Sequence, residues 1–89
     1  MTVARALVVH GEVQGVGFRE SCRAEATSAG VTGWVRNDPD GSVSVHVEGQ
    51  PSAVESVVAW AQRGPRHARV DRVDVQDVPP QALSRFEVR

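Results

Sequence analysis

Apolar and polar residues follow two different spacings along the chain, and each spacing predicts one kind of element. Residues 4–13, ARALVVHGEV, are rich in β-branched side chains and carry apolar residues on both faces of an extended segment. Leu7 and Val9 share one face, while Ala6 and Val8 lie on the other. Because a strand that is covered on both faces has this pattern, the segment predicts an inner strand of a sheet.

Residues 18–30, FRESCRAEATSAG, follow a helical spacing instead. Phe18, Cys22 and Ala26 recur at intervals of four and give the segment one face of apolar and mostly small side chains. Gly30 is placed to end the helix, since glycine readily adopts the left-handed conformation that often follows a last turn. We therefore expect a helix that begins directly after a glycine-rich segment.

Residues 33–49 contain the clearest hairpin pattern in the chain. Valines at alternate positions from Val43 onward are separated by Ser44, His46 and Glu48, which is the period of a half-buried strand. The preceding NDPDG supplies the turn, because asparagine, aspartate, proline and glycine all favour turning. The alternation places His46 on the polar face of its strand.

A second helix is predicted over residues 52–64, SAVESVVAWAQRG. Ser52 and Glu55 have the spacing of a capping box at its start, and Gly64 is placed to end it. The valines and alanines between them repeat at helical intervals and form one buried stripe.

Two further strands complete the pattern, over residues 68–78 and 83–89. In the first of these, the apolar parity changes between Val70 and Val73, which predicts a bulge or a sharp twist there. The second is short and is set off by the proline pair PP.

The predicted order is β-α-β-β-α-β with a short extra strand at the end. This order is typical of an α+β fold of the ferredoxin-like kind, in which two helices cover one face of a mostly antiparallel sheet of four to five strands. At 89 residues we expect residues 1–89 to form one domain. Since this arrangement serves many unrelated functions, the function has to come from the site.

Composition narrows the class of protein. The ten basic residues are all arginine, the net charge is −1 and the pI is about 6.3, which disfavours a dedicated nucleic-acid binder. Cys22 is the only cysteine, so an internal disulfide is excluded and a reducing compartment is favoured. Neither a signal sequence nor an apolar membrane-spanning stretch is evident. We expect a soluble, cytoplasmic monomer without membrane partners.

The glycine-rich segment GEVQGVGFR, residues 11–19, suggests an anion site. It lacks the lysine of a P-loop and the third glycine of a dinucleotide fingerprint. Backbone N–H groups around Gly15 and Gly17 can converge on an anion, and Arg19 can add a bidentate guanidinium at the start of the helix. A tight turn with a solvated arginine remains the alternative from these residues alone.

Two motifs together resemble the signatures of the acylphosphatase family. GEVQGVGFR matches G-x-V-Q-G-V-x-F-R, and GWVRNDPDGSVSVHVEG matches G-W-V-x-N-x3-G-x-V-x5-G, with every spacing kept. The likeness extends over nearly the whole chain. It implies an enzyme that hydrolyses the carboxyl–phosphate bond of small acyl phosphates to a carboxylate and inorganic phosphate, with neither a metal nor a cofactor.

The resemblance also implies the site residues. The family's phosphate-binding loop falls on Gln14, Gly15, Val16, Gly17, Phe18 and Arg19, and Asn37 matches the asparagine that orients the attacking water. An asparagine amide cannot act as a general base, so the base is left open, with the substrate's own phosphate as one possibility. Asp38 stands where several relatives have threonine, which puts the orientation of Asn37 in question.

Other functions are weaker on the residues present. The three histidines lie on different predicted elements without the spacing of metal ligands. The basic residues between Arg63 and Arg72 would suit RNA, but aspartates interrupt them and no stacking aromatics accompany them. A non-catalytic phosphate-sensing module on the same fold stays open, and the physiological acyl phosphate is not indicated.

Overall fold

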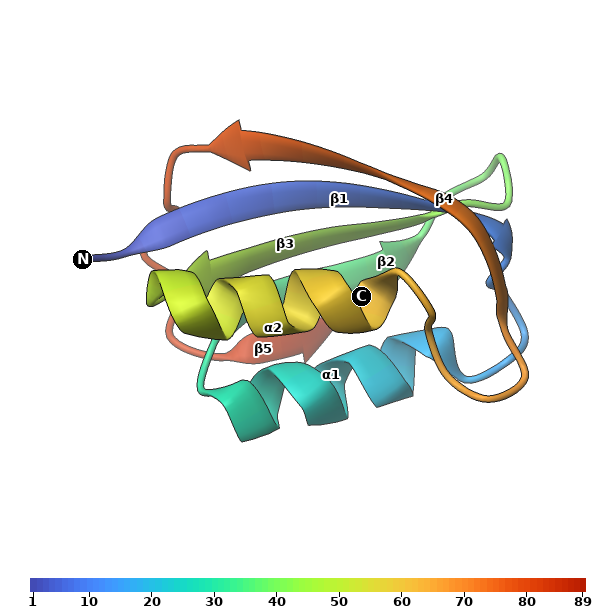
Figure 1. Ribbon diagram of the computed structural model, residues 1–89, viewed down its shortest axis with the longest axis horizontal. Helices are drawn as coiled ribbons and strands as arrows, with labels where there is room; N and C mark the ends of the chain where they lie inside the picture. Colours follow the sequence, from blue (N-terminus) through green and yellow to red (C-terminus); the bar gives the residue numbers. More distant parts are fainter.

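The computed structural model describes every residue from Met1 to Arg89 and has the predicted order of elements (Figure 1). The elements are β1 (Val3–Glu12), α1 (Phe18–Ala29), β2 (Thr32–Asn37), β3 (Val43–Gly49), α2 (Pro51–Ala61), β4 (Arg69–Val78) and β5 (Phe86–Val88). Both helices lie on the same side of the sheet, as Figure 1 shows, which confirms the expected ferredoxin-like α+β arrangement. No helix is long and apolar enough to cross a membrane.

The five strands form one sheet in the order β4-β1-β3-β2-β5. β1 pairs antiparallel with both β3 and β4, which confirms that it is an inner strand, and β3 pairs antiparallel with β2. β5 adds to β2 in the parallel direction. β1, β2 and β5 therefore all run the same way and point toward the same end of the sheet (Figure 1).

The core lies between this sheet and the two helices. Val43, Val45 and Val47 are fully buried, as the alternation in β3 predicts. Phe18, the first residue of α1, packs against Trp60 of α2 with their ring centroids 5.1 Å apart. The start of α1 is thereby fixed to the core, directly beside the glycine-rich loop.

The other face of β3 is buried too, which corrects the expectation of a half-buried strand. His46 and Glu48 are 2% and 3% exposed, and Trp34 stacks on the His46 ring. The connection from β4 to β5 joins opposite edges of the sheet, and its Gln81 and Leu83 N–H groups donate to the Glu48 carboxylate at 2.7 Å. The alternation predicts which side chains share this face, but a local pattern cannot reveal the segment that crosses it.

The ends of α2 differ from the sequence expectation. The helix begins at Pro51 with Gln50 as its N-cap, and no side chain caps it, so the predicted capping box is wrong. Glu55 instead pairs with Arg5 of β1. The helix ends at Ala61 rather than at Gly64, although the Gly64 N–H still donates to the Trp60 carbonyl oxygen at 2.9 Å.

The predicted irregularity in β4 is confirmed. His10 of β1 lies opposite Arg72, but the next residue, Gly11, lies opposite Val70, so Asp71 is the extra residue of a bulge. The bulge increases the twist of the β1–β4 pair near the carboxyl end of β1, where the glycine-rich loop begins.

Candidate active site

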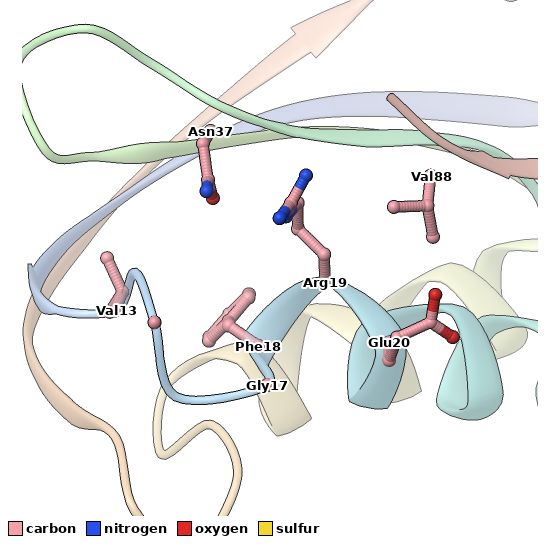
Figure 2. A pocket seen from close by; sticks show the side chains of 8 residues that line it. Val13, Gly17, Phe18, Arg19, Glu20, Asn37 and Val88 are labelled. Carbon is pink, nitrogen blue, oxygen red and sulfur yellow. The ribbon is translucent and has the colours of Figure 1, made fainter.

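A cleft of about 160 Å³ lies at the end of the sheet toward which β1, β2 and β5 point, where α1 begins (Figure 2). Five of the predicted site residues line it: Gly15, Gly17, Phe18, Arg19 and Asn37. They come from the β1–α1 loop, the first turn of α1 and the last residue of β2. The fold thus brings together the two motifs that are separated in the sequence.

The loop bends through two glycines in the left-handed conformation, Gly15 with φ 74° and Gly17 with φ 78°. A Cβ added at either position would meet no atom within 4 Å. Glycine is therefore required here by backbone conformation and not by space, because other residues adopt left-handed angles at a cost of about 1–2 kcal/mol.

Backbone N–H groups at the start of α1 are available to an anion. The first hydrogen bond of the helix runs from the Ser21 N–H to the Gly17 carbonyl oxygen at 3.1 Å, so the N–H groups of residues 18–20 have no acceptor within the helix. No side chain caps this end. The free donors and the positive end of the helix dipole favour a bound negative charge.

The Arg19 side chain extends from the first turn of α1 into the cleft and lies across from Asn37 (Figure 2). Its Nη1 donates to the main-chain oxygen of Arg89 at 3.2 Å, which restrains the guanidinium. The remaining N–H groups of this guanidinium can form the forked contact that suits two phosphoryl oxygens.

Asn37 is the last residue of β2, and its amide points into the cleft from the side opposite the loop (Figure 2). The amide forms no hydrogen bond with another protein group, and the residue is half-buried. An amide in this position can donate to one partner and accept from another, which suits it to orient a small polar molecule.

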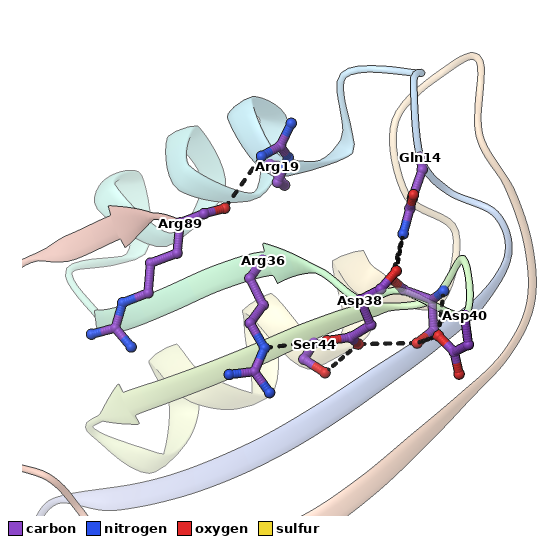
Figure 3. A network of polar contacts seen from close by, with 8 residues as sticks. Gln14, Arg19, Arg36, Asp38, Asp40, Ser44 and Arg89 are labelled. Atoms are coloured by element: carbon purple, nitrogen blue, oxygen red, sulfur yellow. Dashed lines mark hydrogen bonds and ion pairs between the residues drawn. The ribbon is translucent and has the colours of Figure 1, made fainter.

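Gln14 and Val16, also predicted as binding residues, do not line the cleft. The Gln14 amide nitrogen donates to the main-chain oxygens of Asp38 and Ser42, at 2.8 and 2.9 Å (Figure 3). This side chain therefore joins the loop to the β2–β3 turn and sets their spacing. Val16 packs against the core. Any contact of these two residues with an anion has to come from their backbone.

Asp38, the residue after Asn37, is the centre of a hydrogen-bond network in the turn (Figure 3). Its carboxylate accepts from the hydroxyls of Ser42 and Ser44 and from the Arg36 guanidinium. Partial burial opposes ionisation of the carboxyl, but these three donors outweigh it and lower its pKa. An ionised Asp38 holds the turn, so the end of β2 is fixed next to the cleft.

Three lining residues were not predicted from the sequence: Val13, Glu20 and Val88. The two valines form the apolar walls of the cleft. Only the strand order reveals that β5 lies beside it. Glu20 is the one acidic side chain in the lining; it is exposed and faces Arg23 across 3.6 Å. No three His, Cys, Asp or Glu side chains lie close enough together to hold a metal ion.

Comparison with known proteins decides the family. The family model described as acylphosphatase matches residues 5–88. The chain belongs to the acylphosphatase family. A curated acylphosphatase of Nocardioides is 53% identical over 83 residues, covering 93% of this chain and 84% of the relative.

Solved structures agree with this membership. An acylphosphatase from Coxiella burnetii superposes with a TM-score of 0.95 at 34% identity, over 99% of this acylphosphatase chain and 93% of the other. Full-length HypF, in a phosphate- and nucleotide-bound form, matches all of this chain over 12% of its own length, with a TM-score of 0.93 at 27% identity. These matches cover nearly the whole chain and support the acylphosphatase activity that the two motifs predict.

Proposed function

We propose that the cleft hydrolyses small acyl phosphates, with Arg19 and the backbone N–H groups of the loop holding the phosphoryl oxygens and Asn37 positioning the attacking water. The observation that carries this proposal is that Arg19 and Asn37, from different elements, face each other across one small cleft. Donors that meet the three equatorial oxygens stabilise the charge of a phosphoryl-transfer transition state.

The reaction needs little covalent help from the protein. A water oxygen attacks phosphorus in line with the acyl oxygen, the bond from phosphorus to that oxygen breaks, and the carboxylate leaves with the electron pair. The water proton passes to an oxygen of the substrate's own phosphate. Because a carboxylate is a good leaving group, holding the water and the phosphoryl group in line supplies most of the rate enhancement.

The positive charge for this step comes from the protein itself. Arg19 and the amino end of α1 surround the place where the phosphoryl oxygens would lie, so we propose that neither a metal nor a cofactor takes part. The test is hydrolysis of benzoyl phosphate by the purified chain in the presence of excess EDTA. Turnover well above the uncatalysed rate supports the proposal, and turnover that requires an added divalent cation contradicts it.

A second candidate is a phosphate-binding module without catalytic activity. The match to a small part of HypF favours it, because the same fold there forms one segment of a much longer protein. The two candidates differ in one readout. A module would bind inorganic phosphate at this cleft but leave benzoyl phosphate unhydrolysed.

We also propose that residues 1–89 form one domain that acts as a monomer in the cytoplasm. β4 lies at an edge of the sheet and carries Asp71, Arg72, Asp74 and Asp77, and such charges discourage pairing with another chain. Cys22 is buried, and burial raises the pKa of its thiol to about 12, so this cysteine is an unreactive core residue. Sedimentation equilibrium at micromolar concentration tests the monomer, and a dimer mass would contradict it.

A further inference from the structure

A second hollow lies in the groove between α1 and β5, and the reaction described above does not use it. Its volume is about 470 Å³. The lining contains two arginines, three hydroxyl side chains and no acidic residue. The residues that matter for its chemistry are Arg23, Arg85, Thr27, Thr32 and Ser84. Every one of these side chains can donate a hydrogen bond, so the groove suits an anion.

The groove and the catalytic cleft share no lining residue, but both lie along α1 and β5. Arg19 in the cleft and Arg23 in the groove are four residues apart on α1, so they lie on one face of the helix about 6 Å apart along its axis. On the opposite wall, Val88 lines the cleft and Phe86 lines the groove. α1 and β5 run in opposite directions along this seam (Figure 1).

The two arginines are only loosely paired within the protein. Arg23 Nη2 lies 3.6 Å from a Glu20 carboxylate oxygen, and Arg85 Nε lies 3.9 Å from a Glu87 oxygen. Both separations exceed those of a hydrogen bond, and pairs between exposed side chains of this kind contribute little. The guanidinium N–H groups are therefore free to bind an incoming carboxylate or phosphate.

We propose that this groove is a subsite for a second anionic group, a carboxylate or a phosphate ester, at the far end of the substrate's acyl portion. The proposal rests on the proposed function, because a phosphoryl group held at Arg19 fixes where the acyl portion begins. An acyl group that spans about one helical turn brings its distal anion to Arg23 and Arg85. The enzyme then prefers acyl phosphates whose acyl portion carries an anionic group to those whose acyl portion is uncharged.

The experiment compares two substrates that differ only in the distal group, benzoyl phosphate and 4-carboxybenzoyl phosphate. Each is assayed with the wild-type chain, with the double variant Arg23→Gln/Arg85→Gln, and with Arg72→Gln. Arg72 lies on β4, at the opposite edge of the sheet from β5, so this variant removes a positive charge outside the groove. The readout is the ratio of the two KM values. Loss of Arg23 leaves Glu20, which lines the catalytic cleft, without its cationic neighbour. This change would raise the KM of both substrates together and leave their ratio unchanged.

We expect the wild type to have the lower KM for the carboxylated substrate. The double variant should raise that KM about three- to tenfold, change the KM for benzoyl phosphate less than about twofold and leave kcat unchanged, as for the loss of two partly exposed ion pairs. The preference should also fade with added salt.

A KM ratio that is the same in the wild type and the double variant overturns the subsite while the hydrolytic function stands. An equal loss of preference per charge removed in Arg72→Gln also overturns it, since the effect would then come from net charge. Failure of the wild type to hydrolyse benzoyl phosphate at all would contradict the proposed function itself. Circular dichroism of each variant shows that it is folded.

Discussion

Gly17 occupies the last position before α1 and adopts a conformation that only glycine adopts without strain. We expect Gly17→Ala to destabilise the fold by about 1–2 kcal/mol, because the added methyl group meets no atom and the whole cost is conformational. The affinity of this variant for phosphate should also fall, if the loop changes its conformation to relieve the strain. Urea unfolding and phosphate titration measure the two effects, and an unchanged stability would show that the loop angles are not constrained.

Glu20 is the one acidic side chain that lines the cleft, so it is the residue to test as a general base. Since the substrate's phosphate is proposed to take the proton, Glu20→Gln should change kcat for benzoyl phosphate by less than about threefold. Removal of a true general base typically costs about 10²–10⁴-fold. A loss of that size, together with the disappearance of an acidic limb in the pH–rate profile, would make Glu20 the base.

At the scale of the elements, the connection from β4 to β5 is held against the sheet by the buried carboxylate of Glu48. Burial opposes ionisation of Glu48, but the Gln81 N–H, His46 and the Leu83 N–H outweigh it and lower the pKa. The carboxylate therefore stabilises the fold fully above the ordinary glutamate pKa of about 4.3, and this contribution is lost as the pH falls through the lower folded value.

Glu48→Gln replaces this carboxylate by an amide that cannot accept the same set of hydrogen bonds. We expect a loss of about 2–3 kcal/mol of unfolding free energy at pH 7, as for charged hydrogen bonds in a buried place. The difference from the wild type should shrink as the pH is lowered below 4. Urea unfolding across that range measures it, and a difference that does not depend on pH would contradict the ionised, hydrogen-bonded state.

How far the sequence predicts each element depends on whether the controlling contacts are local. The hairpin over residues 33–49 and the C-cap at Gly30 follow from short-range patterns, and both are confirmed. The predicted capping box does not form, because the Glu55 carboxylate accepts a hydrogen bond from Arg5, fifty residues away in the chain. The burial of His46 and Glu48 depends on contacts that are distant in the chain, since Trp34 stacks on His46 and the crossing from β4 to β5 binds Glu48.

The candidate site shows the same division. The motifs place Arg19 and Asn37, and the structure brings the two side chains to one cleft. The sequence could not show that the Gln14 side chain contacts the β2–β3 turn, because the loop and the turn meet only after the sheet forms. Val88 was not anticipated, since its position follows from the parallel pairing of β5 with β2.

For the whole molecule, the cleft joins the ends of three strands to one helix, so a bound anion should stabilise the entire fold. Phosphate at about ten times its Kd adds roughly 1.4 kcal/mol by mass action, which for a domain of this size raises Tm by several degrees. Differential scanning fluorimetry measures the shift. Arg19→Gln serves as the control, because general salt effects of phosphate persist in it while the specific shift should disappear; equal shifts in both would contradict binding at the cleft.

The central claim is that the loop with Arg19 binds the phosphoryl group while Asn37 positions the water. The most direct test measures two quantities for Asn37→Ala and Arg19→Gln, the Kd for inorganic phosphate and kcat for benzoyl phosphate. Asn37→Ala should keep its phosphate Kd within about threefold and lose turnover by about 10²-fold or more, as for a misplaced reactant. Arg19→Gln should lose both. If Asn37→Ala weakens phosphate binding as much as Arg19→Gln does, or if it retains turnover, the assigned roles are wrong.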